Sequence, residues 1–163
     1  MTTRSAEPTR HLPITTEQAE TITSRSAARG RLLLAAGLVL GIAATFLTPL
    51  LVGGYPPLAA FARVSNSVAV VMVLAAGTVM LLGRRALDGT RLVLRRTRQL
   101  RSGIGLAWAF ALLGSLLACA AQGYALTRAT GDAGAAWLLL PLYGLPILPT
   151  SAAVVTGRRL FPV

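Results

Sequence analysis

Four apolar runs without a charged residue dominate this chain, at residues 32–52, 64–83, 104–126 and 135–157. An α-helix rises about 1.5 Å per residue, so a run of about twenty residues crosses the roughly 30 Å hydrocarbon core of a bilayer. The charged residues lie between these runs and at the two ends of the chain. The pattern predicts an all-α membrane protein with four transmembrane helices.

The runs divide the chain into a polar N-terminal arm, residues 1–31, and a four-helix transmembrane domain, residues 32–163. Thr15 followed by Gln18 is the spacing of a capping box and predicts a helix from about Thr16, which can continue into the first span. Two interpretations of the arm stay open: a solvated tail whose basic end lies at the lipid headgroups, or an arm that binds a partner.

Arginines indicate the orientation of the four spans. All sixteen basic residues are arginine, and fourteen of them lie in the arm, in the loop at residues 84–103 or after the fourth run. Only Arg63 and Arg128 lie on the other side of the membrane in this arrangement. Because cytoplasmic loops carry an excess of basic residues, we predict an antiparallel up-down bundle in the cell membrane with both termini cytoplasmic.

The loop at residues 84–103 holds seven arginines and a single carboxylate, Asp88. We expect these arginines to set the topology and to bind anionic lipid headgroups, at about 1 kcal/mol each near an anionic surface. A docking patch for a protein partner is the alternative. Leu87, Leu94 and Leu100 recur at near-heptad spacing, which predicts extensions of the flanking helices or an amphipathic turn on the membrane. The seven residues are Arg84, Arg85, Arg91, Arg95, Arg96, Arg98 and Arg101.

The formal net charge of +11 also raises the question of nucleic-acid binding. The basic loop contains no aromatic side chain on which a base could stack, and its arginines flank membrane spans. We therefore expect anionic lipid, and no nucleic acid, as the partner of these charges.

Small residues mark two candidate helix-packing faces. Gly37 and Gly41 form a small-xxx-small pair in the first span, and Ala111, Ser115 and Cys119 recur every four residues in the third. Small side chains let helix backbones approach closely within a membrane. We predict that these faces contact another helix, within the bundle, in a homo-oligomer or in a larger membrane complex.

The fourth run contains three prolines, Pro141, Pro146 and Pro149, and the third contains the polar Gln122. Proline removes a backbone donor and kinks a helix, so the freed carbonyls need other partners. For the fourth run, a bent structural helix is one interpretation and a broken helix lining a solute path is the other. For Gln122, the interpretations are a hydrogen bond to a neighbouring helix or a role in lining a cavity.

Chemically reactive residues are almost absent from the spans, which contain no Asp, Glu, Lys, Arg or His. Proton- or ion-coupled transport usually requires an ionisable group inside the membrane. We identify no catalytic, cofactor or metal motif, and predict that the chain is not an enzyme. It is expected to be a packing, interaction or accessory subunit. The alternative is a permease-like subunit whose proline-broken fourth helix lines a solute path.

Overall fold

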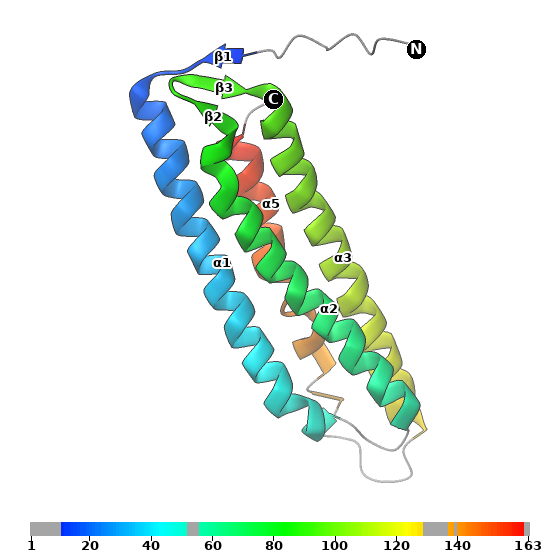
Figure 1. Cartoon of the computed structure of the whole chain (residues 1–163). Helices are drawn as coiled ribbons and strands as arrows, with labels where there is room; N and C mark the ends of the chain where they lie inside the picture. Colours follow the sequence, from blue (N-terminus) through cyan, green and yellow to red (C-terminus); the bar gives the residue numbers. More distant parts are fainter. Residues whose placement is uncertain (1–10, 52–55, 129–136, 139, 162–163) are drawn as a thin grey trace, which may run out of the picture.

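The computed structural model describes residues 11–51, 56–128, 137–138 and 140–161 of the chain. Within these residues, four helices are long and apolar enough to cross a membrane (Figure 1). The prediction of a helical, multi-pass membrane protein is confirmed at this level. The helices are longer than the apolar runs, and a small β-sheet accompanies them.

Helix α1 spans Thr16–Leu51 without a break, so the polar residues 16–31 and the first apolar run form one helix. Its start is the predicted capping box. The backbone N–H of Gln18 donates to Thr15 Oγ1 at 3.2 Å, and the Thr15 N–H donates to Gln18 Oε1 at 3.1 Å. At 1.5 Å per residue, α1 is about 54 Å long, so part of it extends beyond the hydrocarbon core.

Helix α2 spans Pro56–Leu81 and continues as a 3-10 helix, η1, at Leu82–Ala86. It begins eight residues before the second apolar run because Pro56 and Pro57 occupy its first turn. Proline is tolerated there, since the first backbone N–H groups of a helix have no intrahelical partner.

The segment at residues 84–103 is not helical throughout, although its leucine spacing predicts a helix or a turn on the membrane surface. Its first half forms an antiparallel hairpin of β2 (Leu87–Asp88) and β3 (Arg91–Val93). Gly89 in the turn has a φ of 58°, a left-handed conformation that glycine adopts without strain. Strand β1 (His11–Pro13), from the N-terminal arm, pairs with the other edge of β3, so the strand order is β1-β3-β2.

Helix α3 spans Leu94–Thr127 and begins directly after β3, ten residues before the third apolar run. From residue 140 on, the fourth apolar run forms a 3-10 helix η2 at Leu140–Gly144 and helix α5 at Ile147–Leu160. Of the two interpretations of the prolines, a bent or a broken helix, the structure has an interrupted one: Pro146 is the N-cap residue of α5, and Pro149 lies in its first turn. In that turn the missing N–H of proline costs no intrahelical bond.

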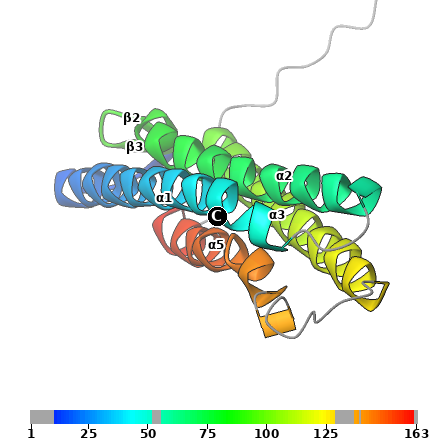
Figure 2. The ribbon, with the colours of Figure 1, turned by 90° about the horizontal axis from the view of Figure 1, so that it is seen from below.

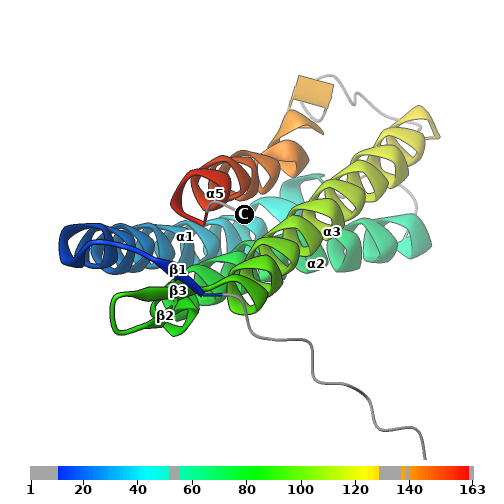
Figure 3. The same cartoon turned by 90° about the horizontal axis from the view of Figure 1, so that it is seen from above.

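Glycines reveal how α1 lies against α2. A Cβ atom added to Gly30 would lie 2.7 Å from Cγ of Leu81, and one added to Gly41 would lie 3.6 Å from Cγ1 of Val70. Residues later in α1 thus lie against residues earlier in α2. Figures 2 and 3, viewed along the bundle, show the four helices side by side, with α3 running obliquely to α1.

The sheet, the start of α1 and the end of α5 lie together at one end of the bundle (Figures 1 and 3). We call this the arginine-rich end, and the end where α1 and α3 finish the distal end. The main apolar core extends into the arginine-rich end, where Phe161 is completely buried. The buried members of this core are Leu33, Val73, Ala76, Met80, Ala86, Leu92, Ile104, Ala107, Ala153, Leu160 and Phe161.

Candidate functional site at the arginine-rich end

The seven arginines of residues 84–103 all lie at the arginine-rich end, on three different elements. The side chains of six of them are exposed, and that of Arg101 is half-buried. We call the seven residues the arginine cap: Arg84 and Arg85 in η1, Arg91 in β3, and Arg95, Arg96, Arg98 and Arg101 in the first turns of α3.

Buried apolar side chains of the same segment fix the backbone of the arginine cap in the bundle. Leu92 and Val93 are 1% and 5% exposed, so the end of β3 is buried in the bundle. Thr97 is fully buried, and its hydroxyl donates to the carbonyl oxygen of Val93 at 3.0 Å. Leu87 and Leu100 pack against the same core. Burial of these residues directs the intervening arginines toward the surface.

The positive charge of the arginine cap is not neutralised by neighbouring carboxylates. Asp88 lies opposite Arg91 in the sheet register, but no arginine of the cap forms an ion pair within the described part of the chain. Arg96 instead donates a hydrogen bond from Nη1 to the backbone oxygen of Arg85 at 3.1 Å. The remaining guanidinium donors are available to an external anion.

A cavity of about 230 Å³ between α3 and α5 brings a further arginine to this end. Gly157 lets the helices approach closely, because a Cβ atom there would lie 3.0 Å from Cδ1 of Ile104. Arg101 and Arg158 line the same cavity, so two cations from different helices surround one recess. The lining residues are Arg101, Ser102, Ile104, Gly105, Val154, Gly157 and Arg158.

Known proteins do not identify this site. No protein-family model, curated protein or solved structure matches the chain. We therefore infer its chemistry from its own residues. Within the described residues, no group of three or more His, Cys, Asp or Glu side chains could hold a metal ion. The arrangement presents planar guanidinium groups, which can form hydrogen bonds and ion pairs with phosphate oxygens.

The first predicted packing face lies against α2. A Cβ atom on Gly37 would lie 2.5 Å from Cδ2 of Leu74, and Gly41 lies one turn further along the same seam. The contact between α1 and α2 also includes Gly30 on α1 and Gly77 on α2. A Cβ atom added to Gly77 would lie 3.1 Å from the carbonyl oxygen of Gly30. Gly30 was not predicted as a packing residue, because it precedes the first apolar run.

The second predicted face is buried to different extents along α3. Ala111 and Ser115 are buried in the bundle, with 0% and 1% of their surface exposed. Cys119 is half-buried, and its Sγ atom lies 3.8 Å from the carbonyl oxygen of Leu140 in η2. The structure therefore places all three residues within one chain, in contact with other helices of the same bundle.

Gly114 lies beside the predicted stripe and brings α3 against the backbone of α2. A Cβ atom on Gly114 would lie 2.7 Å from the carbonyl oxygen of Ser65 and 3.2 Å from the backbone nitrogen of Ala69. Gly114 and Ala118 have the same small-xxx-small spacing as Gly37 and Gly41, a signal that the prediction based on Ala111, Ser115 and Cys119 did not use.

The proline-rich region and Gln122 lie toward the distal end. Pro141 is exposed in η2, Pro146 is buried, and Pro149 is half-buried. Gln122 is completely buried on α3. The residues around η2 form a second apolar cluster with α3, in which Tyr143 is packed with Ala118, Cys119 and Leu140.

The sequence did not indicate a hydrogen bond that joins α3 and α5. The indole Nε1–H of Trp108 donates to Ser151 Oγ at 3.0 Å. The two residues lie on different apolar helices, and a hydrogen bond of this kind holds two helices together within a bilayer. Neither residue type nor spacing indicates such a pair before the helices are placed.

Proposed function

We propose that this chain is a non-enzymatic, multi-pass protein of the cell membrane, built as an antiparallel up-down bundle with both termini in the cytoplasm. The arginine distribution supports this orientation, because fourteen of sixteen arginines then face the cytoplasm. The gathering of the N-terminal strand, the hairpin and the end of α5 at one end of the bundle is consistent with it (Figure 1).

We further propose that the arginine-rich end binds the anionic headgroups of the cytoplasmic leaflet. The observation that carries this proposal is the arginine cap, whose exposed guanidinium groups lie on a backbone seated by buried leucines and have no carboxylate partner among the described residues. The cavity shared by Arg101 and Arg158 offers a recess for one phosphate group.

In this proposal the transmembrane helices supply packing surfaces to a second copy or a larger membrane complex. Helix α1 is the least covered of the four, with 17% of its apolar window buried. Its exposed side chains include Leu38, Val39, Ile42 and Phe46. Lipid covers such a surface in a monomer, and an apolar helix of a partner fits it equally well.

A permease-like subunit is the second candidate, and one observation favours it. Near the break before α5, Tyr143 OH and Ser115 Oγ are buried and have no hydrogen-bond partner within the described residues. Unpartnered polar groups inside a bundle, beside a discontinuous helix, are a feature of solute pathways. Solute uptake by proteoliposomes containing the purified chain would favour this candidate over the first.

The orientation predicts which residues a reagent outside the cell can reach. In a Cys119→Ala background, we expect Thr90→Cys at the hairpin turn to react only with a membrane-permeant maleimide. Thr127→Cys, at the distal end of α3, should react with an impermeant one. Both threonines are exposed, so burial does not confound the comparison. Labelling of Thr90→Cys from outside would contradict the cytoplasmic assignment.

The arginine cap predicts the lipids that remain bound after purification. We would replace Arg91, Arg95, Arg96, Arg98 and Arg101 together with Gln and measure retained phospholipids by mass spectrometry after extraction in mild detergent. At about 1 kcal/mol per basic side chain, the variant should lose most of its excess of anionic lipid. A partial inversion of topology should accompany this loss.

Salt and a distal arginine provide the controls for this experiment. In the wild type, raising the salt from 0.1 to 1 M shortens the Debye length from about 10 to 3 Å, so it should release the same lipids. Arg128→Gln, at the distal end, should retain them. If the five-fold variant keeps both its anionic lipid and its topology, the cap does not bind headgroups, and a soluble partner becomes the better explanation.

A further inference from the structure

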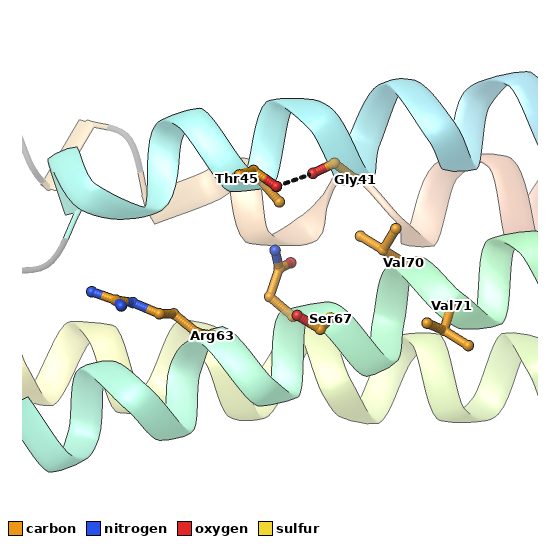
Figure 4. A pocket seen from close by; sticks show the side chains of 8 residues that line it. Gly41, Thr45, Arg63, Ser67, Val70 and Val71 are labelled. Carbon is orange, nitrogen blue, oxygen red and sulfur yellow. Dashed lines mark hydrogen bonds between the residues drawn. The ribbon is translucent and has the colours of Figure 1, made fainter.

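A second cavity, far from the arginine cap, lies between α1 and α2 near the distal end. Its volume is about 460 Å³, within the usual size range of ligand pockets. Figure 4 shows Gly41 and Thr45 on α1 across from Arg63, Ser67, Val70 and Val71 on α2. The lining residues are Gly41, Ala44, Thr45, Arg63, Asn66, Ser67, Val70 and Val71.

The lining of this cavity is amphipathic along its length. Val70 and Val71 lie two turns from Arg63 on α2, so the apolar and cationic parts are about 10 Å apart along the helix. Gly41 lies at the apolar part, facing Val70. The polar side chain of Asn66 lies between the apolar part and the guanidinium.

The length of α2 relates the cationic part of the cavity to the arginine cap. From Arg84, the first arginine of the cap, to Arg63 is about 30 Å along the helix axis, the thickness of the hydrocarbon core. With the cap at one headgroup layer, as proposed above, Arg63 lies at the headgroup layer of the leaflet at the distal end and Val70 among the acyl chains of that leaflet. Within the described residues, no carboxylate pairs with Arg63.

Asn66 provides a second, independent indication of a ligand. Its side chain is 8% exposed and lines the cavity, yet it makes no hydrogen bond to any described residue. Its amide atoms are not among the buried unpartnered atoms of the described residues, so they remain accessible, and a ligand oxygen in the cavity can accept from the N–H groups. Thr45 does not need such a partner, since its hydroxyl donates to the Gly41 carbonyl oxygen at 2.9 Å.

We propose that this cavity binds one anionic phospholipid of the leaflet at the distal end. Its phosphate lies between Arg63 and Asn66, and one acyl chain follows Val70, Val71 and Gly41. The charge of Arg63 and the depth of the site select this ligand, because a phosphodiester is the anion found in that layer. The site goes beyond the proposed function, because it does not involve the arginine cap.

The test measures lipid at the cavity itself, so that lipid bound at the cap does not contribute. A bimane fluorophore attached at Leu38→Cys, in a Cys119→Ala background, reports quenching by bromine-labelled lipid in nanodiscs of phosphatidylcholine. Leu38 is exposed on α1 one turn from Gly41 and does not line the cavity, so the probe does not fill the site. A second probe at Leu116→Cys, exposed on α3 and absent from the cavity lining, gives the background for ordinary lipid contact. Brominated phosphatidylglycerol is compared with brominated phosphatidylcholine at each position.

We expect phosphatidylglycerol to be preferred at Leu38 by on the order of tenfold over the background, the factor that one charge-assisted hydrogen bond contributes. Arg63→Gln should abolish this preference. Arg128→Gln is the matched control and should retain it, because Arg128 is also exposed at the distal end but stacks 5.2 Å from the Tyr124 ring, outside the cavity. Ser67→Phe, which places a ring in the cavity from an exposed position, should abolish it as well.

Three results would overturn the proposal. The first is an equal preference at Leu38 and Leu116, which would mean ordinary lipid contact. The second is a preference for phosphatidylglycerol that survives Arg63→Gln, or quenching by phosphatidylcholine as strong as that by phosphatidylglycerol. Either would mean that the site does not recognise an anionic headgroup. The third is loss of the preference on adding inorganic phosphate, which would identify a free anion as the ligand. Because all of these variants retain the arginine cap, failure here leaves the proposed function untouched.

Discussion

Replacing Phe161 with alanine should lower the stability of the purified protein far more than the same change at an exposed phenylalanine. The ring is completely buried at the arginine-rich end, within the main apolar core. Its Cζ atom lies 2.9 Å from the position of a Cβ atom on Gly83, and Ser26 of α1 lies on the same side. The ring therefore ties the end of α5 to η1 and α1. Removal of a buried phenylalanine costs about 3–5 kcal/mol.

The matched control is Phe46→Ala, because Phe46 is 73% exposed on α1 and loses little contact within the protein. Melting temperatures of both variants in the same detergent measure the difference. We expect a shift of several degrees for Phe161→Ala and a small one for Phe46→Ala. Equal melting temperatures for the two variants would mean that the C-terminal ring does not contribute to the fold.

Gly114→Ala should destabilise the contact between α2 and α3, although alanine is the better helix former. The new Cβ atom would lie 2.7 Å from the carbonyl oxygen of Ser65, a backbone atom that cannot turn away. The contact between α2 and α3 is the most extensive between any two elements of the described structure, and the two helices would have to separate there. Overpacking of this kind costs about 1–3 kcal/mol.

Gly105→Ala is the control on the same helix, because a Cβ atom there would meet nothing within 4 Å. We expect it to stabilise the protein slightly, since alanine is favoured over glycine in helix interiors by about 0.5–1 kcal/mol. The two alanine substitutions should therefore shift the melting temperature in opposite directions. A gain in stability for Gly114→Ala would show that α2 and α3 are not closely packed at this point.

Much of the architecture could be predicted without coordinates. The uncharged runs predicted four apolar helices, because a bilayer admits few other structures for such segments. Thr15 and Gln18 predicted the start of α1, since a capping box involves residues only three positions apart. The prolines predicted a distortion of the fourth span for an equally local reason, but they left open whether the helix bends or breaks.

The candidate sites were predictable only in part. The arginine cap could be located because seven charges cluster in one short segment, but its attachment to a hairpin could not. Short strands such as β2 and β3 carry little periodic signal, and the leucine spacing of the segment favoured a helix instead. The cavity beside Arg63 was not anticipated, because it depends on how α1 and α2 diverge from their glycine contacts.

The sequence by itself determined the number of apolar helices, the start of α1, a distortion of the fourth span at its prolines and the segregation of arginine. These features depend on composition and on neighbours within a few positions of one another. Only the tertiary structure decided that β1 pairs with β3, that the fourth span is interrupted before α5, that Phe161 is buried against Gly83, and that Gly114 lies against the backbone of α2. Those contacts join residues far apart in the chain, and their geometry arises only when whole helices pack against one another.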